Sequence, residues 1–189
     1  MSAAHWRLRL TAMAWLLLGR NEAAEQTFGE MLARWPDDAY ALASRSFVRA
    51  QQGRRGAAIE DARRLVAAHP ERAAGDWFNL GYLLEAEGQT DGAADAFGRA
   101  VALDPKLDRA WYGLGLALLR QGRLDEAMAA LKRNTELQPM SPYGWYQLAR
   151  AHVDCQQPEE ARRIIRHLQG FEPKIAAQLE RETGLATTS

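Results

Sequence analysis

Residues 77–105 read WFNLGYLLEAEGQTDGAADAFGRAVALDP, and the pattern returns at 111–139 as WYGLGLALLRQGRLDEAMAALKRNTELQP and at 145–173 as WYQLARAHVDCQQPEEARRIIRHLQGFEP. Each segment opens on Trp and closes on Pro 28 residues later. The closing prolines belong to a longer series with spacings of 34, 35, 34 and 34 residues. A fixed period of this length indicates tandem structural repeats. The series is Pro36, Pro70, Pro105, Pro139 and Pro173.

Each copy has the pattern of two helices joined by a glycine turn. Trp111, Leu114 and Leu118 fall at i, i+3 and i+7 and form one helical stripe. Gly122 follows, and glycine tolerates the left-handed conformation that ends many helices. A second apolar pattern then runs to Pro139, where the residue before proline avoids the α region. One such pair cannot bury its apolar face alone, so the pairs are expected to stack.

The Trp-x2-Leu-Gly spacing, the turn glycine, an alanine and the closing proline resemble the tetratricopeptide repeat (TPR) family. The resemblance is clearest at Trp77, Leu80, Gly81, Ala93 and Pro105. It implies an all-α fold, a right-handed α-solenoid of helix-turn-helix repeats forming a single domain over 1–189. The expected repeats are 5–38, 39–73, 74–107, 108–141 and 142–175, followed by a capping helix at 175–184 and a frayed tail at 185–189.

Composition narrows the classes of function. The chain has 189 residues, of which 25% are charged, and its 24 basic and 24 acidic residues give zero net charge. General binding to nucleic acid or anionic membrane through net charge is therefore not expected. Cys155 is the single cysteine, which excludes an intrachain disulfide. Arginine greatly outnumbers lysine, which occurs only at 106, 132 and 174, and this usage indicates a GC-rich bacterial source.

The N-terminal segment has two interpretations. Arg7 and Arg9 precede an apolar run from Leu10 to Leu18 that mimics a signal peptide. The run is too short to cross a bilayer, and no small-x-small cleavage site follows it. We therefore expect an amphipathic helix of the folded domain and no membrane insertion. The cytoplasm is the expected location, with the periplasm left open.

In TPR proteins the first helices of successive repeats line a concave groove, and this resemblance supplies the candidate site. The positions between the packing residues carry all five tyrosines of the chain, two phenylalanines and several arginines. Aromatic residues and arginine are typical of protein-binding hot spots. The predicted peptide-binding residues are Arg9, Tyr40, Phe47, Phe78, Asn79, Tyr82, Arg109, Tyr112, Leu116, Arg120, Tyr143, Tyr146, Gln147 and Arg150.

The alternative is that these rings pack against neighbouring helices and bind nothing. If they bind, the excess of arginine over Glu85 in the groove favours a peptide segment with apolar anchors and acidic residues. Nucleic acid could use the same stacking, but zero net charge and the lack of lysine clusters argue against it.

Arg45 stands where other copies have Leu, and Asp61 lies on the partner helix. We expect an ion pair within the repeat, with a ligand-contacting arginine as the alternative.

No residue pattern indicates an enzyme. His152 and Cys155 could share a helix face, but a metal site normally needs three or four ligands, and no second His/Cys cluster is near. His152 is expected to be a partly buried structural histidine. No phosphate-binding glycine loop or Gly-x-Ser-x-Gly motif is present. We therefore predict no catalytic residues, no metal and no cofactor.

The leading hypothesis is a non-catalytic scaffold or adaptor that binds a peptide segment of another protein. Three alternatives stay open: a chaperone-like carrier for secretion or envelope-complex clients, the interaction domain of a larger enzyme, and self-association as a homo-oligomer. Fold and function are separate questions, because such repeats serve many unrelated processes.

Overall fold

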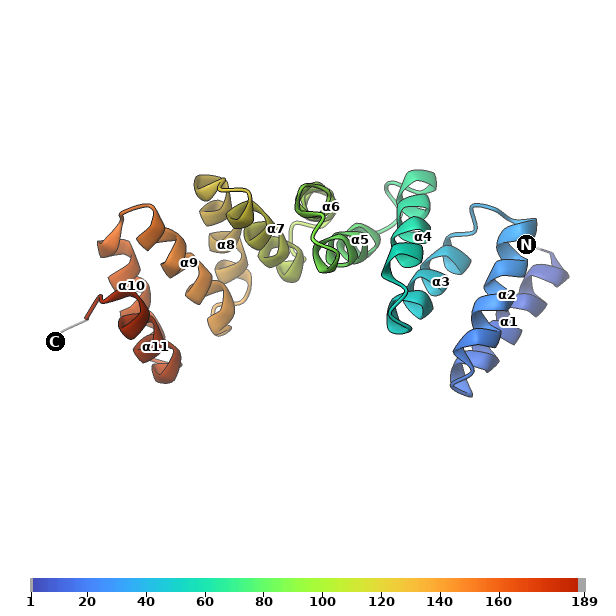
Figure 1. The fold of residues 1–189 in the computed structure, drawn as a ribbon, viewed down its shortest axis with the longest axis horizontal. Coiled ribbons are helices and arrows are strands. Elements are labelled where there is room, and N and C mark those ends of the chain that lie inside the picture. Colours follow the sequence, from blue (N-terminus) through green and yellow to red (C-terminus); the bar gives the residue numbers. More distant parts are fainter. Residues whose placement is uncertain (1, 187–189) are drawn as a thin grey trace. The chain divides into compact units, whose positions relative to one another are not determined.

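A computed structural model describes residues 2–186, and within this range the chain forms eleven helices and no strand (Figure 1). The all-α class is therefore confirmed. The predicted fraying of Thr187, Thr188 and Ser189 lies outside the described residues. The helices are α1 (Ala3–Leu17), α2 (Asn21–Arg34), α3 (Ala39–Gln51), α4 (Arg55–Ala68), α5 (Ala74–Ala86), α6 (Thr90–Leu103), α7 (Asp108–Arg120), α8 (Leu124–Leu137), α9 (Pro142–Asp154), α10 (Pro158–Gln169) and α11 (Pro173–Thr183).

The helices within each repeat are separated by a left-handed turn. Gly19, Gly53, Gly88 and Gly122 all have φ between 68° and 76°, as the glycine spacing predicts. After each of them, an amide N–H reaches the carbonyl five residues back, as in Arg20 N to Trp15 O at 2.9 Å. This bond is the Schellman pattern, which satisfies a carbonyl at the helix end.

The fifth turn has the same geometry without glycine. Gln156 has φ 58°, and the following amide N–H of Gln157 donates to His152 O at 2.8 Å. A side chain in this region carries a steric cost that glycine avoids. We therefore expect Gln156→Gly to raise the free energy of unfolding by about 0.5–1 kcal/mol. Urea denaturation measures this change, and Gly122→Gln, the reverse substitution in the fourth turn, should lower stability. Loss of stability in Gln156→Gly would contradict this account of the turn.

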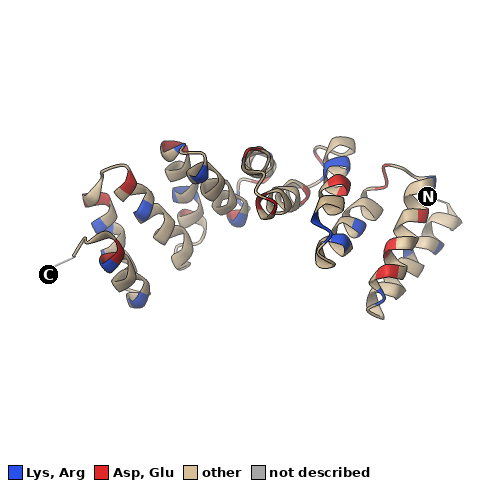
Figure 2. Ribbon diagram, viewed as in Figure 1, with Lys and Arg blue, Asp and Glu red and all other residues tan. Residues whose placement is uncertain are grey.

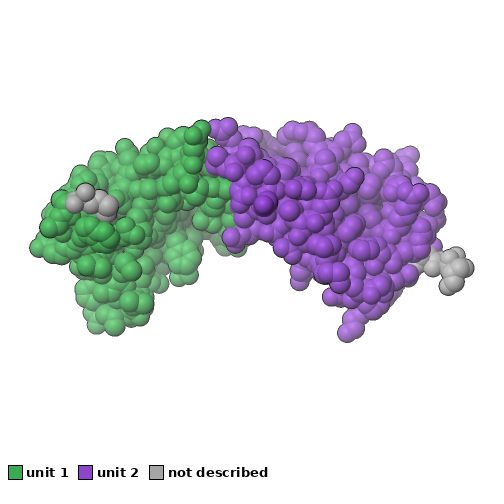
Figure 3. Space-filling view, turned by 180° about the vertical axis from the view of Figure 1, so that it is seen from behind, with its two compact units in different colours: residues 1–89 green, residues 90–189 purple. Residues whose placement is uncertain are grey.

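The residues fall into two compact units, Met1–Gln89 and Thr90–Ser189 (Figure 3). The boundary lies inside the third expected repeat, between α5 and α6. In the first unit, α1 packs on α2, α2 on α3, α3 on α4 and α4 on α5. Its core contains Phe28, Met31, Leu42, Val48 and Leu65, all nearly or fully buried.

The second unit repeats the same succession of neighbours from α6 to α11. One core cluster contains Leu131, Leu148, Ile165, Leu168 and Leu179. Helices approach closely where the sequence has small residues. A Cβ on Gly113 would lie 2.7 Å from the Phe97 ring, and one on Gly115 would lie 2.6 Å from Leu131 Cγ.

The recurrent tryptophans join one repeat to the next. The indole N–H of Trp77 donates to Pro70 O at 2.7 Å in the first unit. In the second unit, Trp111 donates to Pro105 O at 3.0 Å and Trp145 to Pro139 O at 2.9 Å. Each bond reaches the carbonyl of the proline that closes the preceding helix. The shared spacing of Trp and Pro therefore has a direct structural cause.

Candidate functional site

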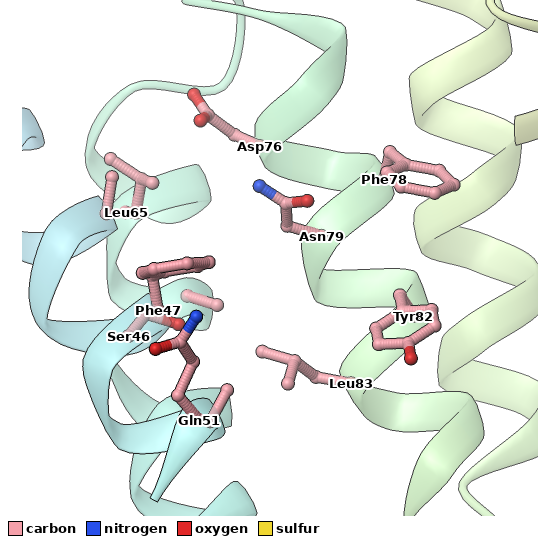
Figure 4. Close-up of a pocket in the computed structure, with 12 residues that line it drawn as sticks. Ser46, Phe47, Gln51, Leu65, Asp76, Phe78, Asn79, Tyr82 and Leu83 are labelled. Carbon is pink, nitrogen blue, oxygen red and sulfur yellow. The ribbon is translucent and has the colours of Figure 1, made fainter. Parts of the chain in front are cut away.

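The first unit contains a pocket between α3 and α5 with a volume of about 420 Å³ (Figure 4). Three of the predicted groove aromatics stand on its walls. Phe47 on α3 and Tyr82 on α5 are 60% and 62% exposed, which is unusual for rings of this size. Phe78 on α5 is half-buried. The remaining lining residues are Ala43, Ser46, Ala50, Gln51, Ala62, Leu65, Asp76, Asn79 and Leu83.

Two of the polar side chains that line this pocket already form hydrogen bonds within the protein. The Ser46 hydroxyl donates to Ala58 O at 2.8 Å, and Arg72 Nε donates to Asp76 Oδ2 at 2.8 Å. In contrast, the side-chain amides of Gln51 and Asn79 have no hydrogen-bond partner among residues 2–186. The pocket therefore offers an apolar lining and two amide groups that can both donate and accept hydrogen bonds.

Two other predicted groove residues of the first unit pack against each other. The Arg9 guanidinium carbon lies 4.0 Å from the centre of the Tyr40 ring. Tyr40 is half-buried and makes an edge contact with the core residue Phe28 at 5.9 Å between ring centres. This cation–π contact joins α1 to α3. Neither Arg9 nor Tyr40 lines the pocket between α3 and α5.

In the second unit, five of the predicted residues line two further pockets, whereas Leu116, Arg120 and Arg150 line neither. One is lined by Tyr143, Tyr146 and Gln147 of α9 with Ile175 and Gln178 of α11. The other is lined by Arg109 and Tyr112 of α7 with Tyr143 and residues from α8 and the α8–α9 turn. Tyr143, which is 70% exposed, is the ring common to both.

The other two tyrosines of this unit are partly packed. Tyr112 and Tyr146 both contact the cluster that contains Leu131. The Tyr146 hydroxyl also donates to Glu182 Oε2 of α11 at 2.6 Å. This bond raises the pKa of Tyr146, as does its partial burial, and it lowers the pKa of Glu182. The C-terminal helix α11 thus holds one predicted binding residue in place.

The predicted residues of the second unit other than its tyrosines differ in exposure. Arg109, Arg120 and Arg150 are exposed, whereas Leu116 and Gln147 are half-buried. Basic and acidic residues are mixed along the helices of both units (Figure 2). Gln51 of α3 and Leu65 of α4 also line the first pocket and are not among the residues predicted from the sequence. Helical periodicity could have found Gln51, which lies one turn after Phe47.

Arg45 forms the predicted ion pair within its repeat. Its guanidinium donates to both carboxylate oxygens of Asp61, at 2.6 and 2.8 Å. Arg49 joins the pair, with Nη1 donating to Asp61 Oδ2 at 3.0 Å and Nε to Glu25 Oε1 at 2.9 Å. Burial raises the pKa of Glu25, but hydrogen bonds from Arg54 and Arg49 outweigh this and leave the pKa below its usual value. The network connects α2, α3 and α4.

Across residues 2–186, no three His, Cys, Asp or Glu side chains lie close enough together to hold a metal ion. His152 Nδ1 is hydrogen-bonded to Gln157 Oε1 at 2.7 Å, and Cys155 is half-buried. No helix in the described part of the chain is long and apolar enough to span a bilayer.

Paired antiparallel helices, glycine turns and Trp-to-Pro bonds define this chain as a helical-repeat protein of the α-solenoid class. Family models described as tetratricopeptide repeat match residues 48–108 and 78–142, and a further one matches 142–167. These matches cover more than half of the chain, which therefore belongs to the TPR family.

Solved structures with the same fold include other TPR proteins. The chain is similar to MamA (20% identity, TM-score 0.81, covering 100% of this chain and 98% of that one). It is equally similar to YrrB, described as a TPR protein with an unusual peptide-binding site (20% identity, TM-score 0.81, covering 90% and 88%). A TPR protein from Parabacteroides merdae aligns at 17% identity with a TM-score of 0.80, covering 97% and 75%. At these identities the likeness shows the fold alone. No curated protein matches the chain by sequence.

Proposed function

We propose that this chain is a non-catalytic adaptor that binds a peptide segment of another protein, with the pocket between α3 and α5 as its anchor site. The observation that carries the proposal is the pair of exposed rings, Phe47 and Tyr82, on the walls of an apolar pocket. Exposed rings cost hydration free energy in the free protein, and a ligand side chain that covers them recovers it. Aromatic residues that line a pocket are frequent binding hot spots.

The two unpaired amides support an extended peptide as the ligand. Gln51 on α3 and Asn79 on α5 both line the pocket, so each can reach a chain that passes through it. A peptide main chain presents an N–H and a C=O at nearly every residue. A side-chain amide matches both groups, because it is donor and acceptor at once. An apolar side chain would fill the pocket, and its flanking backbone would bond to these amides.

The second unit by itself favours a ligand segment with acidic residues. Arg109, Arg120 and Arg150 are exposed on α7 and α9, the same helices that carry Tyr112 and Tyr143. Arginine pairs with carboxylates through two parallel hydrogen bonds, which adds selectivity. YrrB, with the same fold, is itself described as having a peptide-binding site, and this supports a peptide as the ligand class.

The proposal is tested by selecting peptides from a random phage-displayed library on the wild-type protein and measuring their affinity by fluorescence anisotropy. We expect peptides with one large apolar residue. Phe47→Ala and Tyr82→Ala should each weaken binding about tenfold, equivalent to about 1.4 kcal/mol. Because both rings are exposed, neither substitution should unfold the protein, and circular dichroism checks this.

Met140→Ala is the matched control, since Met140 is 67% exposed and lies outside the lining of the pocket. It should leave the affinity unchanged. Failure to select any peptide, or equal affinity in the pocket variants and the control, would contradict the proposed function.

A further inference from the structure

The first helix has an apolar face that nothing covers among residues 2–186. Leu10 is 57% exposed and Leu17 is 87% exposed, and Leu18 follows at 68%. Leu10, Ala14 and Leu17 lie three and four residues apart, so they share one side of α1. The core residues Leu8 and Ala12 point to the other side, toward α2. A row of exposed leucines on a helix marks an interaction surface.

The corresponding positions on α3 show what kind of partner fits part of this face of α1. Arg7 and Ala14 of α1 correspond, 34 residues on, to Ala41 and Val48 of α3, which are fully or almost fully buried. Both lie on α3, which packs against α2, the helix that precedes it. In α1 the corresponding residues are exposed. Small residues such as Ala14 allow another helix to approach closely, so a helix fits this face better than a lipid surface.

Helices α1 and α11 expose side chains of different chemistry. Helix α11 exposes Lys174, Arg181 and Glu182, which suit water. The face of α1 has the opposite character. Among residues 2–186, α1 is the helix with the most strongly exposed leucines, so a second copy of α1 presents a matching apolar face.

We propose that two copies of this protein associate through α1, with the two helices packed antiparallel. Centred near Ala12, this arrangement places Leu10 of each copy over the small Ala14 of the other. It also places Arg7 beside Leu17 and the C-terminus of the partner helix. That terminus carries negative partial charge, and α1 has no basic residue in its last turn to offset it. A parallel pairing would instead bring the two copies of Arg7 together.

A single helix pair buries less than the roughly 800 Å² per partner of a standard interface. The dimer should therefore be weak and reversible, with a dissociation constant on the order of 10 µM. Sedimentation velocity of the full chain over a concentration series measures it. The wild type should shift from monomer to dimer, and Leu10→Glu should remain monomeric. Leu103→Glu is the matched control, because Leu103 is an exposed leucine on α6, and it should dimerise like the wild type.

Orientation is tested by two variants of one exposed position. In the antiparallel pairing, Leu17→Glu faces the partner's arginine at position 7, whereas Leu17→Lys repels it. We expect Leu17→Glu to dimerise at least tenfold more tightly than Leu17→Lys at low salt, with the difference falling as salt is added. Equal affinities for the two variants would overturn the antiparallel arrangement.

A wild type that stays monomeric across the series would overturn the proposal, as would a dimer that Leu10→Glu does not weaken. Flotation with anionic vesicles tests the remaining alternative, that this face of α1 binds a lipid surface. Binding of monomers to vesicles that depends on Leu10 and Leu17 would assign this face to a lipid surface and overturn the dimer.

Discussion

Replacing Asp61 with alanine is expected to lower the free energy of unfolding by about 3 kcal/mol. Asp61 is only 3% exposed and accepts hydrogen bonds from both Arg45 and Arg49. Both guanidinium groups are themselves largely buried. Without the carboxylate, Arg45 loses the acceptor of both its hydrogen bonds, and Arg49 keeps only Glu25 as an acidic partner, so positive charge is left poorly compensated away from water. Urea denaturation of the purified protein measures the loss.

A double substitution distinguishes this explanation from simple loss of packing. Other repeats have Leu80, Leu114 and Leu148 at the position of Arg45 and Ala96 and Ala130 at that of Asp61. Arg45→Leu combined with Asp61→Ala restores this apolar pairing. Because replacing a buried ion pair by apolar residues is often neutral or stabilising, the double variant should recover most of the lost stability. A loss below about 1 kcal/mol in Asp61→Ala, or additive losses in the double variant, would contradict the role of this pair.

The second large effect is expected at a glycine of the second unit. Gly113→Ala should lower the free energy of unfolding by about 2 kcal/mol, because the new Cβ would lie 2.7–2.9 Å from three atoms of the Phe97 ring. Phe97 is 1% exposed and has no room to move away. The gain in helix propensity from Gly to Ala is smaller than this overpacking. Thermal unfolding followed by circular dichroism measures the net result.

Gly98→Ala provides a matched control in the adjacent helix. No atom lies within 4 Å of a Cβ built on Gly98, which is in the interior of α6. The same substitution should therefore raise stability there, by up to about 1 kcal/mol. Equal effects at the two glycines would show that helix propensity, and not contact between α6 and α7, determines the outcome.

The fold was predictable from the sequence because the repeat signal is carried by residues with strong local effects. Gly53 and Gly122 adopt the left-handed turn that only glycine enters easily, and Trp111 bonds to the carbonyl of Pro105. Gln156 shows the limit of this reasoning. The chain there keeps the turn without glycine, because the surrounding helices determine the backbone as much as the residue does.

The candidate site was predictable only in part. Periodicity places Tyr40, Phe47 and Tyr82 on the same side of their helices, yet Tyr40 packs against the core while the other two are exposed. Exposure depends on the size of side chains on the next helix, which periodicity does not report. Phe28 contacts Tyr40, and Glu182 binds Tyr146 from a helix 36 residues away. Long-range contacts of this kind decide which rings remain available.

The central claim is that the pocket between α3 and α5 receives an apolar side chain of a bound peptide. Nuclear magnetic resonance of the labelled protein, titrated with a selected peptide, tests it most directly. We predict that the side-chain amide signals of Gln51 and Asn79 shift, together with the ring signals of Phe47 and Tyr82. Unchanged signals from these four residues, with shifts confined to other helices at saturating peptide, would contradict the claim.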